Sequence, residues 1–204
     1  MISIINYGLG NVLAIANIYQ RLGIPARIVT SAAELSDAER IILPGVGAFD
    51  WAMTRLNESG MREQLEKLVV GASRPVLGIC VGMQMMAARS DEGVLAGLRW
   101  IDGEVKKFDE ASFTAKTRLP HMGWNDVAPR QSEGLFRGLA SEARFYFLHS
   151  YYFVPGRDGD VLAETDYNGR FASSVRRGNV WGVQFHPEKS HQWGIRLLQN
   201  FAGL

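Results

Sequence analysis

The stretch PVLGICVGMQMMAAR, residues 75–89, decides the fold. Residues 75–79 form a short apolar run that is typical of a buried strand, and residues 81–89 predict a helix directly after it. Only Cys80 lies between the two, so the chain must turn sharply there. A strand that leads straight into a helix is the repeating unit of α/β folds, in which helices connect parallel strands.

The same alternation is found on the N-terminal side of this unit. Residues 2–6 form an apolar run that ends in a glycine turn, and apolar residues then follow at helical spacing from residue 12 to residue 19. Further strands are predicted at residues 27–30 and 40–43, and further helices at residues 49–57 and 61–70. We therefore expect an α/β fold with a doubly wound, mostly parallel sheet.

The second half of the chain has a different pattern. It predicts strands at residues 100–108, 144–153, 161–165, 171–176 and 180–185, and a closing amphipathic helix at residues 191–201. The pairs Asn168-Gly169 and Gly178-Asn179 are typical of hairpin turns. This half is therefore expected to extend the parallel sheet with antiparallel strands.

The composition excludes several classes of protein. The 204 residues include 22 basic and 21 acidic side chains, so no basic excess is present to bind nucleic acid. A single cysteine excludes an intrachain disulfide. The longest nearly apolar stretch, residues 75–88, is too short to cross a membrane, and no secretory leader is evident. We expect one cytoplasmic domain, residues 1–204, without a metal or a cofactor.

Cys80 is the candidate nucleophile. A lone cysteine is most often a small buried apolar residue. Here, however, Gly78 and Gly82 flank it at two positions before and after, which removes side chains that would clash at a sharp turn, as in G-x-S-x-G elbows. A helix N-terminus beside the sulfur favours the thiolate, and the Val81 N–H can stabilise an oxyanion.

His186 and Glu188 are the candidate base and its orienting group, although HPE could also be a polar surface turn. They follow the apolar strand at residues 180–185, and Pro187 favours an extended conformation at His186. Residues i and i+2 of an extended chain point the same way, so Glu188 can fix the tautomer of the imidazole. Because sites in parallel sheets gather at the carboxyl ends of strands, we expect Cys80 and His186 to meet.

A second glycine-rich turn, PGVG at residues 44–47, follows the strand at residues 40–43. It is either an ordinary turn or a loop that presents a second backbone N–H beside Cys80. Val46, Gly47 and Val81 are therefore the candidate oxyanion donors.

Several segments together resemble a known family. GICVGMQ (78–84), LPGVGAF (43–49) and GVQFHPEKS (182–190) resemble the class I glutamine amidotransferases. PHMGWN (120–125), FLHSYYF (147–153) and NYGLGN (6–11) are similar to the glutaminase subunit of imidazole glycerol phosphate synthase. The matches follow the family's order along nearly the whole chain. The resemblance implies the flavodoxin-like fold of class I glutaminases.

The resemblance also implies a reaction and a partner. Cys80 would attack the side-chain amide of glutamine and form a thioester, with His186 moving the proton and Glu188 orienting it. Gln84 and the backbone of Ser150 and Tyr151 would hold the substrate. Ammonia would pass to a (β/α)₈ cyclase subunit that makes imidazole glycerol phosphate and an aminoimidazole carboxamide ribotide in histidine biosynthesis. The family's partner-facing positions fall on Asn11, Pro120, Met122, Trp124, Tyr146 and Lys189.

Other functions remain open at this stage. The segments at residues 100–108, 145–153 and 188–201 resemble paralogues that supply ammonia to a surface-polysaccharide sugar, with the same chemistry at Cys80. A stand-alone cysteine hydrolase or stress protein is an alternative of another class, and so is an inactive interaction protein. We also expect low glutaminase activity without the liganded cyclase, because an unguarded thioester would waste glutamine.

Overall fold

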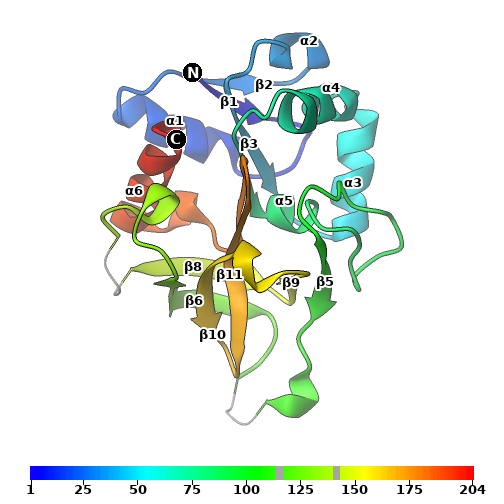
Figure 1. Ribbon diagram of the computed structural model, residues 1–204, viewed down its shortest axis with the longest axis vertical. Helices are drawn as coiled ribbons and strands as arrows, with labels where there is room; N and C mark the ends of the chain where they lie inside the picture. Colours follow the sequence, from blue (N-terminus) through cyan, green and yellow to red (C-terminus); the bar gives the residue numbers. More distant parts are fainter. Residues whose placement is uncertain (114–116, 140–142) are drawn as a thin grey trace.

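The computed structural model describes residues 1–113, 117–139 and 143–204. Its main sheet has the strand order β2-β1-β3-β4-β12-β11-β10-β7 (Figure 1). Strands β2 to β12 of this order are parallel, and β11, β10 and β7 continue the sheet in antiparallel pairs. The bounds are β1 Ile2–Ile5, β2 Ala26–Val29, β3 Arg40–Gly45, β4 Val76–Cys80, β7 Ala128–Pro129, β10 Val161–Asp166, β11 Arg170–Arg177 and β12 Val180–Val183. The expected parallel sheet with an antiparallel extension is confirmed.

Helices cover both faces of the parallel part of the sheet. Figure 1 shows α1 (Val12–Arg21) and α6 (His191–Ala202) on one side, and α3 (Phe49–Glu58) and α4 (Arg62–Glu66) on the other. Each long helix buries an apolar face, which its 3.6-residue periodicity provides. The helix expected at residues 61–70 is α4 followed by one π-helical turn, Lys67–Gly71. Within the described ranges, no helix is long and apolar enough to cross a membrane.

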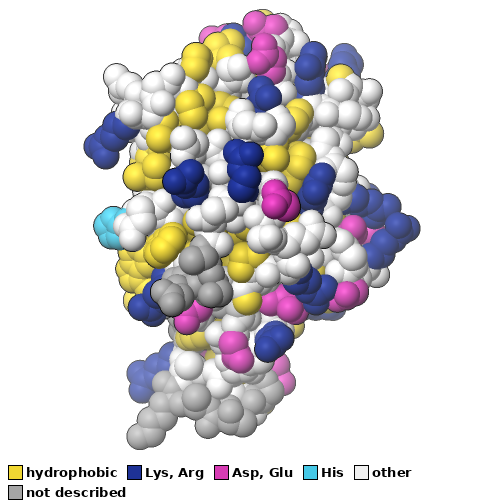
Figure 2. Space-filling model, turned by 60° about the vertical axis from the view of Figure 1, so that its left-hand side comes forward, with side chains coloured by type: hydrophobic (Ala, Val, Ile, Leu, Met, Phe, Trp, Pro, Cys, Tyr) yellow, Lys and Arg dark blue, Asp and Glu magenta, His cyan; other side chains and the backbone are white. Residues whose placement is uncertain are grey.

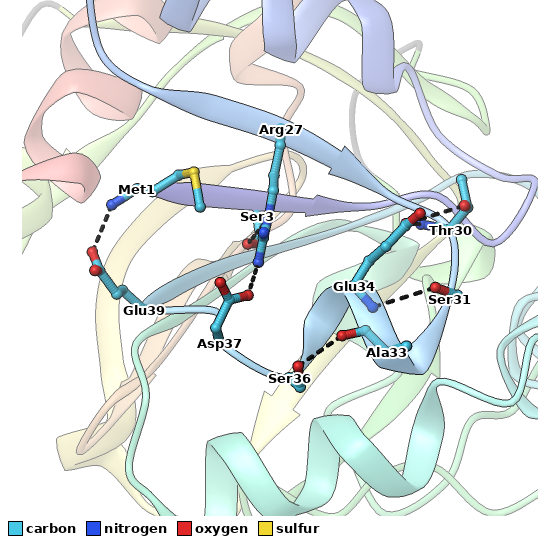
Figure 3. A network of polar contacts seen from close by, with 10 residues as sticks. All are labelled: Met1, Ser3, Arg27, Thr30, Ser31, Ala33, Glu34, Ser36, Asp37 and Glu39. Atoms are coloured by element: carbon cyan, nitrogen blue, oxygen red, sulfur yellow. Dashed lines mark hydrogen bonds and ion pairs between the residues drawn. The ribbon is translucent and has the colours of Figure 1, made fainter.

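Short polar contacts fix the edge of the sheet at β2 and the short helix α2 (Ala32–Leu35). Ser31 caps α2 by accepting the Glu34 N–H, and the Glu34 carboxylate accepts from the Thr30 N–H at 2.8 Å (Figure 3). The arrangement is similar to a capping box, except that the Glu34 carboxylate reaches the residue before the N-cap. Arg27 of β2 pairs with Asp37 just after the helix. These contacts stabilise the outer edge of the sheet and lie away from the carboxyl end of β4.

The helix expected at residues 81–89 is much shorter in the structure. Helix α5 is a single turn, Val81–Gln84. The carbonyls of Met85 and Ala87 accept from the N–H groups of Leu98 and Arg99, at 2.7 and 3.1 Å. A longer helix would need those carbonyls for its own hydrogen bonds, so the returning segment stops the helix after one turn.

The strand expected at residues 144–153 is broken at Ser150. Strand β8 (Arg144–His149) pairs with β6 (His121–Asp126) in a small separate sheet, whereas β9 (Tyr151–Pro155) pairs with β5 (Gly103–Lys107). The structure also starts β5 at Gly103 rather than at residue 100. The break at Ser150 therefore separates the strand of the small sheet from the strand that joins the main sheet.

Candidate active site

Cys80 stands at a strained turn between β4 and α5. Its backbone has φ 56° and ψ −114°, a conformation that side-chain-bearing residues rarely adopt. A Cβ atom on Gly82 would overlap the carbonyl oxygen of Leu43 in the neighbouring strand, and one on Gly78 would lie 2.7 Å from the Gly82 carbonyl oxygen. Only glycine fits these positions, so the two glycines allow the turn that presents the sulfur at the end of the sheet.

His186 lies beside Cys80 and is held by Glu188. Glu188 Oε1 is 3.0 Å from His186 Nδ1, and both side chains are almost completely buried. Burial acts to lower the pKa of His186, but its hydrogen bonds with Cys80 and Glu188, together with their negative charge, outweigh burial and raise the pKa to about 10. The positive charge next to the sulfur therefore comes from His186, since α5 has too few peptide dipoles to supply it.

Glu188 reaches the imidazole by a different route from the one expected. His186 is extended, with φ −100° and ψ 94°, but Pro187 then opens a 3-10 turn, Pro187–Lys189. The Ser190 hydroxyl closes this turn by donating to the His186 carbonyl at 2.6 Å. Proline suits the first position of a helical turn because it has no N–H to leave unpaired. The turn, and not an extended chain, folds the carboxylate back onto the ring.

A cleft of about 350 Å³ opens over Cys80, a volume in the range of small-molecule sites. It brings together the nucleophile, the base and all six of the residues expected to donate to an oxyanion or to hold a substrate. The lining residues are Val46, Gly47, Cys80, Val81, Gln84, Glu92, Pro120, Leu148, His149, Ser150, Tyr151, His186 and Lys189.

Gln184 and Glu92 are among the site residues that were not predicted from the sequence. Gln184, fully buried, donates from Nε2 to Cys80 Sγ at 3.7 Å. It lies two residues before His186 on the same chain segment, and this spacing is a signal that could have found it. Glu92 lines the cleft and accepts from the Phe49 N–H at 2.8 Å. Burial is the main cause that raises the pKa of Glu92, and no local pattern marks it because only the tertiary fold brings it here.

A chain of hydrogen bonds runs from Tyr151 and His149, which line the cleft, to His121 and Asn125 of β6. His149 Nδ1 lies 2.8 Å from the Tyr151 carbonyl, so it must donate, and His149 Nε2 then accepts from His121 Nδ1 at 3.0 Å. The remaining His121 nitrogen accepts from the Asn125 amide at 3.2 Å. Burial is the main cause that lowers the pKa of His121 to about 4 and of His149 to about 3. Both rings are therefore neutral, with fixed tautomers.

The outer face of the same two strands is apolar and exposed. Met122, Trp124 and Leu148 expose 65%, 39% and 39% of their surface, and Trp124 pairs with Tyr146 across the strands. Hydrophobic side chains gather at the surface on this side of the molecule (Figure 2). Lys189 lies over the Tyr146 ring at 5.6 Å.

The structure thus gathers most of the expected partner-facing positions at one side of the cleft. Pro120 and Lys189 line the cleft itself, and Met122, Trp124 and Tyr146 lie on the adjoining strands. Asn11 is exposed at the start of α1, outside both of these strands.

Comparison with known proteins identifies the family. The profile described as "Glutamine amidotransferase class-I" matches residues 3–203. The chain belongs to the class I glutamine amidotransferases. This confirms the family that the motifs indicated and, with it, a glutaminase rather than a hydrolase of another class.

Relatives within this amidotransferase family match over the whole length. The "Imidazole glycerol phosphate synthase subunit HisH" of Bdellovibrio bacteriovorus is 57% identical over 99% of both chains. The protein of the same name from Leptospira interrogans is 48% identical over 100% of both chains. A solved structure titled as a glutamine amidotransferase has a TM-score of 0.73 at 22% identity, covering 100% of this chain and 99% of that one, which bears on the fold alone. The expected likeness to the glutaminase subunit of that synthase is confirmed.

Proposed function

We propose that residues 1–204 act as the glutaminase subunit of an imidazole glycerol phosphate synthase, with Cys80, His186 and Glu188 as its catalytic triad. The observation that carries the proposal is the meeting of Cys80, at a strained elbow, with a buried, Glu188-bound His186 in one cleft. The names of the full-length relatives support the choice of synthase.

The first half of the reaction transfers the glutamyl group to sulfur. With the proton held on His186, Cys80 Sγ attacks the side-chain amide carbon of glutamine. Glu188 stabilises the imidazolium through its 3.0 Å hydrogen bond. His186 then protonates the departing nitrogen, so that the carbon–nitrogen bond breaks and ammonia leaves a γ-glutamyl thioester on Cys80.

The second half hydrolyses the thioester. Water attacks the thioester carbon while His186 takes its proton, and the carbon–sulfur bond breaks to release glutamate. Both tetrahedral intermediates carry an oxyanion, which the N–H groups of Val81 and of the loop at Val46 and Gly47, all of which line the cleft, would stabilise. Val46 is 38% exposed, and under this proposal its loop rearranges when a partner docks.

The cleft offers charges that fit a free amino acid. Glu92 lines the cleft, and its carboxylate would pair with the α-ammonium group of glutamine. Ser150, Tyr151 and Gln84 also line the cleft and would bind the rest of the substrate. This arrangement supports a small polar substrate rather than a polymer.

The apolar face on β6 and β8 is the expected dock for a (β/α)₈ cyclase. Exposed Met122, Trp124 and Leu148 form the kind of contiguous apolar surface that marks a protein interface. Pro120, Leu148 and Lys189 belong to the rim of the cleft as well as to this side of the molecule. Ammonia that leaves the cleft at this rim would therefore enter a docked partner directly.

The experiment measures glutamate release from glutamine by the wild type and by Cys80→Ala. Each is assayed alone and with the histidine-pathway cyclase of the same source and its ribonucleotide ligand. A glutamine-analogue electrophile with mass spectrometry reports whether Cys80 is the labelled nucleophile. We expect low release alone, strong stimulation by the liganded cyclase, and no activity in Cys80→Ala.

Other results would change the proposal in distinct ways. Labelled Cys80 without stimulation would retain the glutaminase and redirect its ammonia to another acceptor, such as a polysaccharide sugar. Full activity of the isolated chain would refute the dependence on a partner. An unlabelled Cys80 would refute the triad.

A further inference from the structure

Two buried carboxamides connect the wall of the cleft to the nucleophile. Gln84 Nε2 is 3.1 Å from the Tyr151 carbonyl oxygen and 3.0 Å from Gln184 Oε1. Gln184 Nε2 in turn is 3.7 Å from Cys80 Sγ, within hydrogen-bond distance for sulfur. Gln84 is 2% exposed and Gln184 is fully buried, so water does not satisfy either group in their place.

The orientation of both amides is forced. A carbonyl oxygen only accepts, so the end of Gln84 that faces Tyr151 must be its NH₂ group. The second proton of that NH₂ needs an acceptor, which makes Oε1 the end of Gln184 that faces Gln84. The NH₂ group of Gln184 must then face the sulfur. This assignment does not depend on how the amides are drawn, because a main-chain carbonyl sets it.

We propose that Gln184 is a further catalytic residue, whose side-chain N–H aims the Cys80 sulfur and stabilises it as the leaving group of the thioester. This inference rests on the proposed function. His186 and the oxyanion donors act on the proton and on the carbonyl oxygen, whereas Gln184 acts on the sulfur from inside the protein.

The donor matters most when the thioester is hydrolysed. Water adds to the thioester carbon and gives its proton to His186, and the carbon–sulfur bond then breaks with its electron pair moving to Sγ. A hydrogen bond to sulfur is stronger for the negatively charged product of this step than for the neutral thioester. It therefore lowers the barrier to hydrolysis more than it assists the attack that forms the thioester.

The test compares two substitutions of Gln184 with a matched control. Gln184→Met keeps the length of the side chain and removes the donor. Gln184→Glu still accepts from Gln84 but turns a carboxylate oxygen towards the sulfur. The control, Ser174→Ala, removes another fully buried hydrogen bond, to the Gly182 carbonyl at 2.8 Å on the neighbouring strand. All are assayed with the cyclase partner for kcat, and by rapid quench and mass spectrometry for the fraction of enzyme held as γ-glutamyl thioester.

We expect kcat to fall about tenfold in Gln184→Met, the size of one hydrogen bond to a charged group, while the thioester fraction rises. Gln184→Glu should lose more activity, and Ser174→Ala should behave as the wild type. If Gln184 only packs, both variants will keep the wild-type kcat and thioester fraction per folded molecule, and the inference is wrong. Failure of the glutamine analogue to label wild-type Cys80 would instead refute the proposed function itself.

Discussion

The buried pair His121 and His149 should make the protein sensitive to acid. The unfolded value for each ring is 6.5, and burial lowers the folded pKa to about 4 for His121 and about 3 for His149. Below pH 6.5 the unfolded chain therefore binds two protons that the folded chain excludes, so the free energy of unfolding falls as the pH falls. From pH 7 to pH 5 each histidine costs the folded state about 2 kcal/mol, at about 1.36 kcal/mol per pH unit.

His121→Phe should remove about half of this dependence. The ring of His121 is stacked between Phe147 and Tyr167, at centroid distances of 4.6 and 3.9 Å, so phenylalanine keeps the packing and loses the titrating group. The assay is urea unfolding at pH 7 and pH 5. The difference between the two free energies of unfolding should be about 2 kcal/mol smaller in the variant than in the wild type.

A matched control separates titration from lost contacts. Asn125→Ala removes the hydrogen bond to His121 but leaves both histidines in place. It should lower stability at both pH values and keep the wild-type difference between them. An equal pH dependence in the wild type and His121→Phe would refute the reasoning.

Two further predictions concern the catalytic elbow and the base. Glu188→Gln should reduce kcat for glutamine hydrolysis about a thousandfold in the glutamate-release assay, because the imidazolium loses its buried anionic partner. The control Glu58→Gln, at an exposed ion pair, should keep kcat within about threefold of the wild-type value. Gly82→Ala should lower the free energy of unfolding in urea by about 3 kcal/mol and abolish activity, because the new Cβ would overlap the Leu43 carbonyl oxygen. The control Gly159→Ala, which has open space around it, should change the free energy of unfolding by less than about 0.5 kcal/mol. A stable, active Gly82→Ala protein would contradict the account of the elbow.

The parallel half of the fold could be predicted because local pattern and tertiary structure agree there. Buried strands such as β3 and β4 read as continuous apolar runs, and the helices that cover them have apolar faces at 3.6-residue spacing. The end of α5 could not be predicted, because what stops it is a segment more than ten residues further along the chain. A run of Val, Met and Ala is compatible with a longer helix, and only the tertiary contact decides.

The small sheet was harder to predict. Strand β6 includes His121, Gly123 and Asn125, residue types that are common in turns, and its pattern of exposure makes sense only when β8 lies beside it. The strand expected at residues 144–153 is equally plausible as one piece. Its division at Ser150 follows from pairing with two different sheets, which no local feature of this aromatic-rich run indicates.

The sequence identified site residues whose role requires an unusual backbone conformation. It missed residues whose role requires only that a side chain lies close to the site. Cys80 is marked by its glycines and His186 by the proline after it, so each leaves a sequence pattern. Glu92 leaves no such pattern, and Gln184 is marked only by its place two residues before His186, because an ordinary side chain on an ordinary backbone reaches the site in each case. Sequence patterns therefore record backbone constraints better than side-chain contacts.

The position of the base is tied to the strand that would face the partner. The His186 N–H donates to the Tyr146 carbonyl at 2.8 Å, and the Ser190 hydroxyl accepts from the Tyr146 N–H at 3.0 Å while it donates to the His186 carbonyl. The main chain of β8 thus holds both sides of His186, while the Tyr146 ring lies on the outer face under Lys189. Under the proposed function, a cyclase docked on β8 would contact the strand whose main chain positions His186, the group that moves the proton.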